Sequence, residues 1–251
     1  MPLCPTRLRF HLEATTPIFF PPLKAENIWR GMAGLLLPRV APAAAPSLLN
    51  PHWSQAPSGY ATPPKPFLFR AFHLDGQRFQ PGQLLHIDVH VFAPRLPIRE
   101  SLEGAICLLE TEGLGPGRGK LRLTGITESA FGSRTQPLRN ELTIDLLTPT
   151  NCSPAYDTFL PRLRERINAL TACYTSEPLL PPLPHNSGIT LANDQTTLTP
   201  RARYSTRTGQ TYGTGGRTGT FTYQGDLAAA LPILRLGEAT GLAGGWFQMI
   251  E

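Results

Sequence analysis

A glycine-rich segment followed by basic side chains is the first feature of this sequence that suggests a ligand site. Residues 113–119 read GLGPGRG, and Lys120 follows directly. Glycines let the backbone approach a bulky anion closely, and Arg118 and Lys120 supply positive charge beside it. This combination predicts an anion-binding loop. Ordinary turn chemistry, which also uses glycine, is the alternative.

Arginine supplies almost all of the positive charge. The 251 residues include 20 Arg and 3 Lys, with a net charge of +5 and a pI near 9.3. A guanidinium suits bidentate phosphate contact and stacking on bases, which favours an anionic partner, although a G/C-rich genome would enrich arginine equally. The basic residues gather at the glycine loop and the strand after it, on one helix face, and around a later hairpin: Arg118, Lys120 and Arg122; Arg162 and Arg166; Arg201, Arg203, Arg207 and Arg217. Scattered solvated charge is the alternative for each group.

Neither the histidines nor the cysteines predict a metal site. His86, Asp88 and His90 share one face of an expected strand. Residues four apart on a strand lie about 13 Å apart, too far to share one ion directly, so we interpret these three as a polar sheet face. The four cysteines lie far apart without any CxxC, which argues against a zinc site and a disulfide framework and fits a reducing cytoplasm. We expect no metal and no cofactor.

The elements that must position these residues follow one order in the first half of the chain. Alternation predicts a strand over 6–13, and apolar spacings of three and four predict a helix over 24–37. A proline-rich loop is expected over 38–66. Two strands (about 67–74 and 84–92), a helix (about 101–112) and a strand (120–126) follow. The order β-α-β-β-α-β is ferredoxin-like.

The second half repeats this order. We expect a strand over 140–148, a helix over 153–174, strands over 201–207 and 217–223, a helix over 227–240, a second glycine loop over 241–245 and a final strand. Helix, glycine loop and strand thus occur twice, which indicates a degenerate internal duplication. The sequence predicts an α+β protein of two tandem ferredoxin-like (βαββαβ, RRM-like) domains, residues 1–132 and 138–251, with an excursion at about 175–200.

No segment suggests a membrane. The N-terminus lacks the apolar core of a signal peptide, and the most apolar span, residues 31–46, is interrupted by Arg39 and by prolines. We therefore expect a cytoplasmic protein without a membrane partner.

Five stretches of the sequence carry a family resemblance. In chain order they read IWRGMAGLLL, FQPGQLLHIDVHVF, GLGPGRGKLRLTGI, LTIDLLTPT and RYSTRTGQTYGTGGRTGTFTYQGDLAAALPILRLGEATGL. Together they resemble the CRISPR repeat-processing endoribonucleases, the precursor-crRNA-cleaving branch of the RAMP superfamily. The C-terminal GLAGGWFQMIE is shorter than the family's glycine loop and lacks its Lys or Ser, and the 175–200 excursion has no family counterpart. These departures predict a divergent member, of a minimal or type IV-like system.

The resemblance implies a RAMP-type fold and metal-independent cleavage of CRISPR precursor RNA within the repeat stem-loop. A 2′-hydroxyl attacks the adjacent phosphate, the bond from phosphorus to the 5′ oxygen breaks, and the products are a 2′,3′-cyclic phosphate and a 5′-hydroxyl. In the family, the catalytic groups come from the first helix and the loop after it. Here that region offers His52 as general base and Arg30 and Arg39 to stabilise phosphate charge. Packing of His52 against Trp53, a solvated Arg30, or an arginine-based site that orients the RNA are the alternatives.

The resemblance also implies partners. The basic groups named above would hold the phosphates of an RNA hairpin, and the mature crRNA would stay bound within a complex of CRISPR effector subunits. A non-catalytic RAMP subunit that binds guide RNA as a scaffold is the main alternative, and an unrelated ferredoxin-like RNA-binding or metabolic protein is a more distant one.

Overall fold

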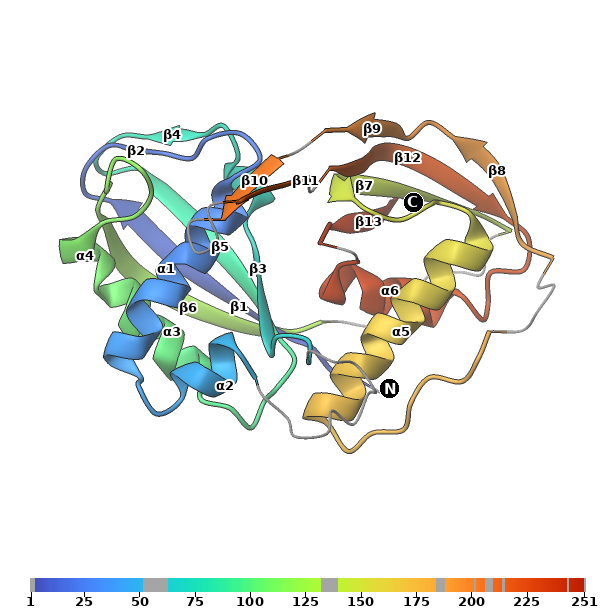
Figure 1. The fold of residues 1–251 in the computed structure, drawn as a ribbon, viewed down its shortest axis with the longest axis horizontal. Helices are drawn as coiled ribbons and strands as arrows, with labels where there is room; N and C mark the ends of the chain where they lie inside the picture. Colours follow the sequence, from blue (N-terminus) through green and yellow to red (C-terminus); the bar gives the residue numbers. More distant parts are fainter. Residues whose placement is uncertain are drawn as a thin grey trace. The chain divides into compact units, whose positions relative to one another are not determined.

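The computed structural model describes residues 3–51, 63–131, 140–183, 188–200, 202–205, 210–213, 215–242 and 244–250, with the backbone alone considered in 202–205 and 210–213. The chain divides into two compact units (Figure 1). The first comprises Met1–Phe131 with Ala169–Glu177, and the second comprises Gly132–Asn168 with Pro178–Glu251. Within the described residues, no helix has the length and apolar character that a bilayer span requires.

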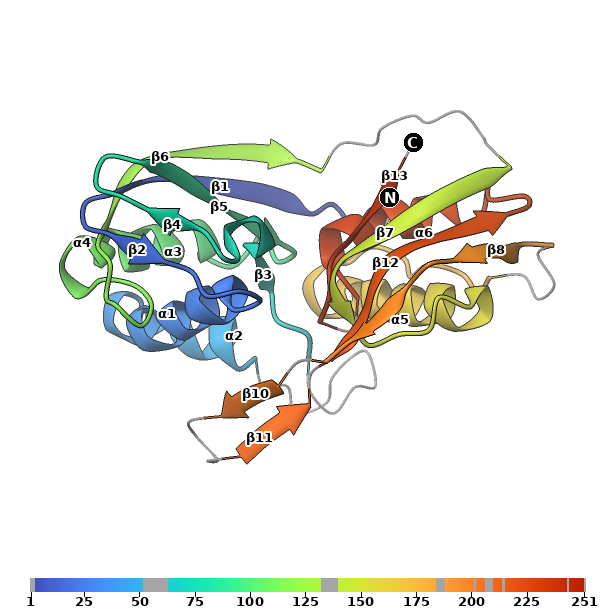
Figure 2. The same cartoon turned by 90° about the horizontal axis from the view of Figure 1, so that it is seen from above.

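The first unit is built on an antiparallel four-stranded sheet in the order β3-β5-β1-β6. Its strands are β1 (Thr6–Ala14), β3 (Phe67–Arg70), β5 (Leu84–Val91) and β6 (Leu121–Ala130). Helices α1 (Ala25–Val40) and α3 (Ile98–Cys107) pack side by side on one face of this sheet (Figures 1 and 2). Shorter elements complete the unit: β2 (Ile18–Phe19), α2 (Ala45–Leu49), η1 (Phe72–Leu74), β4 (Arg78–Phe79) and α4 (Leu109–Glu112).

The second unit repeats this topology. Its sheet has the order β13-β7-β12-β8, and β9 also pairs with β12. When the strands of each unit are numbered along the chain, both sheets read 4-1-3-2, which confirms two ferredoxin-like folds in tandem. The elements are β7 (Glu141–Thr150), α5 (Tyr156–Tyr174), β8 (Thr190–Asp194), β9 (Thr197–Thr199), β12 (Gly216–Gln224), α6 (Leu231–Thr240) and β13 (Phe247–Ile250).

The structure differs from the sequence expectation between residues 175 and 213. Strands β8 and β9 lie inside the expected excursion and supply the edge of the second sheet. The expected strand over 201–207 contains β10 (Ala202–Ser205), which pairs with β11 (Gln210–Gly213) in a separate two-stranded sheet. A short edge strand such as β8 is mostly exposed and carries little apolar alternation, so periodicity does not reveal it.

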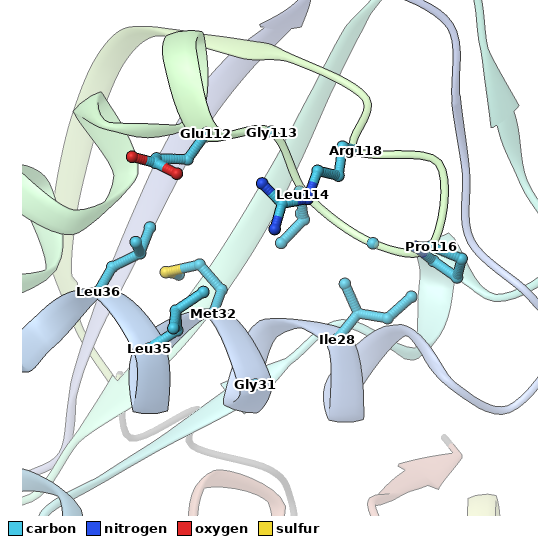
Figure 3. Close-up of a pocket in the computed structure, with 11 residues that line it drawn as sticks. Ile28, Gly31, Met32, Leu35, Leu36, Glu112, Gly113, Leu114, Pro116 and Arg118 are labelled. Carbon is cyan, nitrogen blue, oxygen red and sulfur yellow. The ribbon is translucent and has the colours of Figure 1, made fainter.

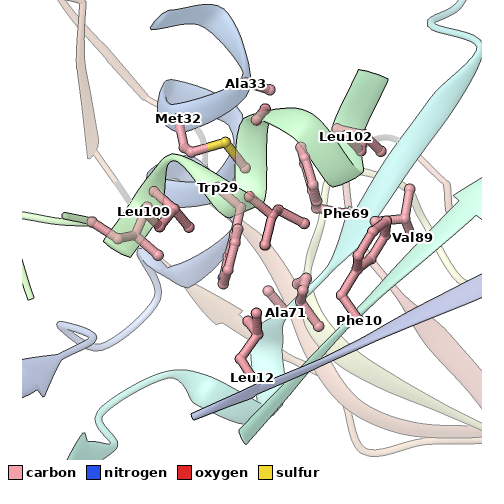
Figure 4. Packing of buried hydrophobic residues seen from close by; sticks show 14 of the residues in the cluster. Phe10, Leu12, Trp29, Met32, Ala33, Phe69, Ala71, Val89, Leu102 and Leu109 are labelled. Carbon is pink, nitrogen blue, oxygen red and sulfur yellow. The ribbon is translucent and has the colours of Figure 1, made fainter. Parts of the chain in front are cut away.

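Helix α1 is held in place from two sides. Its Trp29 is fully buried, with its ring centroid 6.4 Å from that of Phe20 and 6.2 Å from that of Phe69. Figure 4 shows Trp29 and Phe69 in this core. At its N-terminus, the backbone N–H of Ala25 donates a hydrogen bond of 2.8 Å to the carboxylate of Asp75. This carboxylate caps the helix although it lies 50 residues away in the sequence.

The core of the second unit brings its two helices close together. The ring of Phe159 on α5 contacts those of Phe221 and Phe247 at centroid distances of 5.3 and 5.5 Å. A Cβ on Gly237 of α6 would lie 2.5 Å from a methyl carbon of Leu163 and 2.6 Å from Cζ of Phe247, so a larger residue here would displace these core side chains.

The face of the first sheet that carries Arg9 and Asp88 is polar and internally paired. Arg9 forms a bidentate ion pair with Asp88, with N–O distances of 2.7 and 2.9 Å. Burial raises the pKa of Asp88, but the hydrogen bonds and charge of Arg9 outweigh it, so the pKa lies below the ordinary 3.8. His86 stacks on His73 at 4.4 Å, and His90 is fully buried beside Phe131. Across the described ranges, no three His, Cys, Asp or Glu side chains converge as metal ligands.

We predict that Arg9→Met lowers the free energy of unfolding by about 3 kcal/mol, because it leaves the Asp88 carboxylate, only 3% exposed, without its counter-charge. Chemical denaturation at pH 7 measures this value. Adding Asp88→Asn should recover part of the loss. In the wild-type protein, the contribution of the Arg9–Asp88 pair to the free energy of unfolding is fully present above pH 3.8. It is lost as the pH falls through the lower pKa that Asp88 has in the folded state. If Arg9→Met were as stable as the wild type, Arg9 would not be the counter-charge that stabilises the buried Asp88 carboxylate.

Candidate functional site

The two glycine loops begin in the same backbone conformation. Each begins with a glycine that ends a helix in the positive-φ region, Gly113 at φ 72°, ψ 169° and Gly241 at φ 61°, ψ 173°. A buried leucine follows in each loop, and an isolated β-bridge joins it to a later glycine, Leu114 to Gly119 and Leu242 to Gly245. The predicted order of helix, glycine loop and strand is therefore confirmed in both units. The N-terminal loop is two residues longer and contains an arginine.

The N-terminal loop, residues 113–119, is closed by contacts that only glycine permits. A Cβ on Gly113 would lie 2.2 Å from the carbonyl oxygen of Arg118, and one on Gly119 would lie 2.6 Å from Cβ of Ile18. The backbone N–H of Leu114 donates a hydrogen bond of 2.8 Å to the carbonyl oxygen of Gly119. These contacts fix the loop in one conformation against the sheet.

Arg118 occupies a backbone conformation that favours glycine. Its φ is +48°, in the left-handed region, where a side chain costs about 1 kcal/mol or more. Glycine stands on both sides of Arg118, and the guanidinium at this strained position is exposed. Strained positions of this kind cluster at functional sites, so we take Arg118 as the first functional candidate of the loop.

A groove of about 290 Å³ separates this loop from α1 (Figure 3). Ile28, Gly31, Met32 and Leu35 form its helical wall, and Leu114 to Pro116 form the opposite wall. We call this cavity the loop–helix groove. In Figure 3 the guanidinium of Arg118 lies beside Leu114 and Met32, and the carboxylate of Glu112 lies near Leu36. The groove therefore combines apolar walls with one cation and one anion.

Glu112 is tied to α1 by an ion pair. Nη2 of Arg39 donates a hydrogen bond of 2.8 Å to Oε1 of Glu112. The pKa of Glu112 lies below its ordinary value because Arg39 donates this hydrogen bond and carries a positive charge, and the charge of Arg118 contributes more weakly. Glu112 is ionised at neutral pH. The sequence-based search for basic side chains missed this carboxylate, although its position directly before the glycine loop is a usable signal.

The catalytic candidates from the sequence do not converge within the described residues. Arg30 forms an ion pair with Glu26 at 3.6 Å, and Arg39 forms the pair with Glu112. Nine positions separate the two arginines, which places them on opposite sides of α1 and about 14 Å apart along its axis. We therefore expect only one of them to approach a given phosphate. His52 lies outside the described residues.

The candidate RNA-binding residues differ in how far their side chains are already engaged. Lys120 is exposed beside the glycine loop, whereas Arg122 pairs with Glu13 at 2.8 Å. In the second unit, three arginines donate to neighbouring oxygens, Arg162 to the Asn151 carbonyl (3.4 Å), Arg166 to the Thr240 carbonyl (2.8 Å) and Arg217 to Thr196 Oγ1 (3.1 Å). Arg201, Arg207 and the side chain of Arg203 lie outside the described part.

Comparison with known proteins identifies the fold. The family described as "AF_1859_N: N-terminal domain" matches residues 3–145. A solved "Cas6 (TTHB231) product complex" is 18% identical with a TM-score of 0.54, covering 98% of this chain and 100% of that chain. "An RAMP protein binding different RNA substrates" is 14% identical with a TM-score of 0.52 and the same coverage. A "Partial Cas6-RT-Cas1--Cas2 complex" is 13% identical with a TM-score of 0.51, covering 100% of this chain and 47% of that chain. No curated protein matches this chain. The predicted fold of two tandem ferredoxin-like domains is confirmed, and these solved structures share it.

We predict that Arg118→Gly leaves the free energy of unfolding within about 1 kcal/mol of wild type, because relief of the positive-φ strain offsets the greater freedom of glycine in the unfolded chain. Thermal or denaturant unfolding measures the difference. Gly119→Ala is the contrasting variant, since its Cβ would lie 2.6 Å from Ile18 Cβ and 2.8 Å from the Pro17 oxygen, and it should cost about 1–3 kcal/mol. A large loss of stability in Arg118→Gly would show that the arginine serves packing.

Proposed function

The chain belongs to the family described as "AF_1859_N: N-terminal domain", and from this membership and its RAMP-type fold we propose that it processes CRISPR RNA. In this proposal the protein is a metal-independent endoribonuclease that cleaves precursor RNA within the repeat stem-loop. It retains the mature crRNA and delivers it to effector subunits. The fold likeness to a Cas6 product complex extends over 98% of the chain, which supports an RNA ligand of the same kind.

Among the described residues, the position of Arg118 supports the proposal most strongly. Arg118 presents its guanidinium at a strained position of a closed glycine loop, beside a groove, and forms none of the ion pairs found among the described residues. Lys120 follows it on the same loop–strand connection. A rigid backbone with cations of this kind suits an anionic polymer, because little conformational freedom is lost when the RNA binds.

The proposed chemistry assigns a role to each catalytic candidate. The imidazole of His52 accepts the proton of the attacking 2′-hydroxyl. The guanidinium of Arg39 or Arg30 stabilises the charge of the pentacoordinate phosphorus, and exchanges its carboxylate partner for the phosphate when RNA arrives. The remaining basic residues hold the strand so that attack proceeds in line.

A scaffold subunit that binds guide RNA without cutting it is the second candidate. The ion pairs Arg30–Glu26 and Arg39–Glu112 favour it, because a guanidinium already neutralised by a carboxylate stabilises phosphorane charge less well. Both candidates use the loop–helix groove for RNA, and they differ only in the cutting step.

We predict that the purified protein, incubated in EDTA with its cognate repeat RNA, produces two fragments on a denaturing gel. A 2′-deoxy substitution at the cut site should abolish cleavage, since the 2′-hydroxyl is the nucleophile. The roles of the three candidates are then separated by the single-turnover cleavage rates of His52→Ala, Arg30→Ala and Arg39→Ala. The cleavage rate of His52→Ala should fall by about 100-fold or more, because this variant lacks the general base. Tight binding with intact RNA would refute the nuclease and support the scaffold.

We predict that Arg118→Gly weakens binding of the repeat RNA about tenfold, the loss expected for one charge-assisted contact. Fluorescence anisotropy at fixed salt measures the dissociation constant. Arg99→Ala is the matched control, because it removes an equally exposed arginine that pairs with Glu128 away from the groove, and it should change affinity far less. Equal losses in both variants would mean that only the total charge matters.

A further inference from the structure

The loop–helix groove has the dimensions and walls of a site for one flat ring. Its volume of about 290 Å³ lies just below the roughly 300–1,000 Å³ found for drug-sized ligands, which suits a smaller occupant. Ile28, Met32 and Leu35 offer apolar surface from α1, and Leu114 and Pro116 offer it from the loop. Leu35 is 61% exposed, so the apolar wall is open to solvent. A methionine sulfur next to such a wall is favourable for an aromatic ring.

The two charged groups of the groove select against a purely apolar occupant. An aliphatic side chain placed there would remove water from Arg118 and Glu112 without offering a hydrogen bond in return, which is unfavourable for any polar group and more so for a charged one. One oxygen of Glu112 is engaged by Arg39, and none of the described residues donates to Oε2. The groove thus fits a ligand with apolar faces, acceptors at one end and donors at the other, which describes a nucleobase.

We infer that the loop–helix groove binds a single unpaired guanine of the RNA, with Arg118 and Glu112 as its specificity residues. Guanine presents the acceptors O6 and N7, the commonest partners of an arginine, next to the donors N1–H and N2–H₂, which suit a carboxylate. Adenine places its amino group where Arg118 needs an acceptor, and uracil lacks the amino group that Glu112 would bind. This inference rests on the proposed function, since it assumes that RNA is the partner.

Gly31 makes the groove accessible. It lies on the wall formed by α1, and a Cβ on it would meet no atom within 4 Å, so a larger side chain would extend into the groove. Gly34 on the same helix is equally exposed and equally open, but it does not line the groove. Replacing either glycine by leucine favours the helix to a similar degree, so both variants should fold.

The test uses oligoribonucleotides of sequence UUUXUUU, in which X is guanine, adenine, cytosine, uracil, inosine or an abasic site. Dissociation constants are measured by anisotropy in EDTA for the wild type, Gly31→Leu and Gly34→Leu. We expect the wild type to bind the guanine heptamer about tenfold more tightly than the uracil heptamer, and inosine in between because it lacks N2–H₂. Gly31→Leu should lose this preference, and Gly34→Leu should keep it.

Other outcomes overturn the inference in distinguishable ways. Equal affinity for every heptamer, or a guanine preference that persists in Gly31→Leu, removes the groove as a base site while leaving RNA binding intact. Tightest binding of another base refutes the guanine assignment. If the wild type binds none of the heptamers and leaves its cognate repeat RNA both unbound and uncut, the proposed function itself fails. If it still binds the repeat RNA, only the groove inference fails.

Discussion

Closure of the N-terminal glycine loop is the constraint on which the candidate site depends. Gly119 sits against Ile18 and Pro17 at distances that exclude any side chain, and Leu114 pairs with Gly119 across the loop. These contacts fix the loop wall of the groove, while burial of Trp29 and the cap from Asp75 fix the wall formed by α1. Because both walls are set by the folded core, the groove exists before any ligand binds, and the ordering cost of recognition is small.

The internal repeat shows what is specific to this loop. Both units end a helix with a glycine of nearly the same φ and ψ and continue with a buried leucine. The C-terminal loop, GLAGG, therefore performs the structural task of the motif without any basic residue. The N-terminal loop is two residues longer and carries Arg118 at positive φ, a feature that the C-terminal loop lacks. We interpret this addition as the functional part of the loop.

Strong periodic signals made much of the fold predictable. The alternation of β1 and the apolar spacing of α1 and α5 placed the main elements, and the repeated helix–loop–strand order indicated the duplication. The edge strands β8 and β9 escaped because an exposed edge carries little apolar pattern. At the site, composition identified Arg118, but the pairing of Arg39 with Glu112 joins residues 73 positions apart, which no local pattern encodes.

We propose that RNA lies in the groove between α1 and the N-terminal glycine loop. Photo-cross-linking of the protein to repeat RNA that carries 4-thiouridine, followed by mass spectrometry of the cross-linked peptides, tests it most directly. The structure predicts cross-links within residues 28–36 and 112–118, which line the groove or lie between its lining residues. Cross-links confined to other parts of the chain, with these two segments unlabelled, would contradict the account.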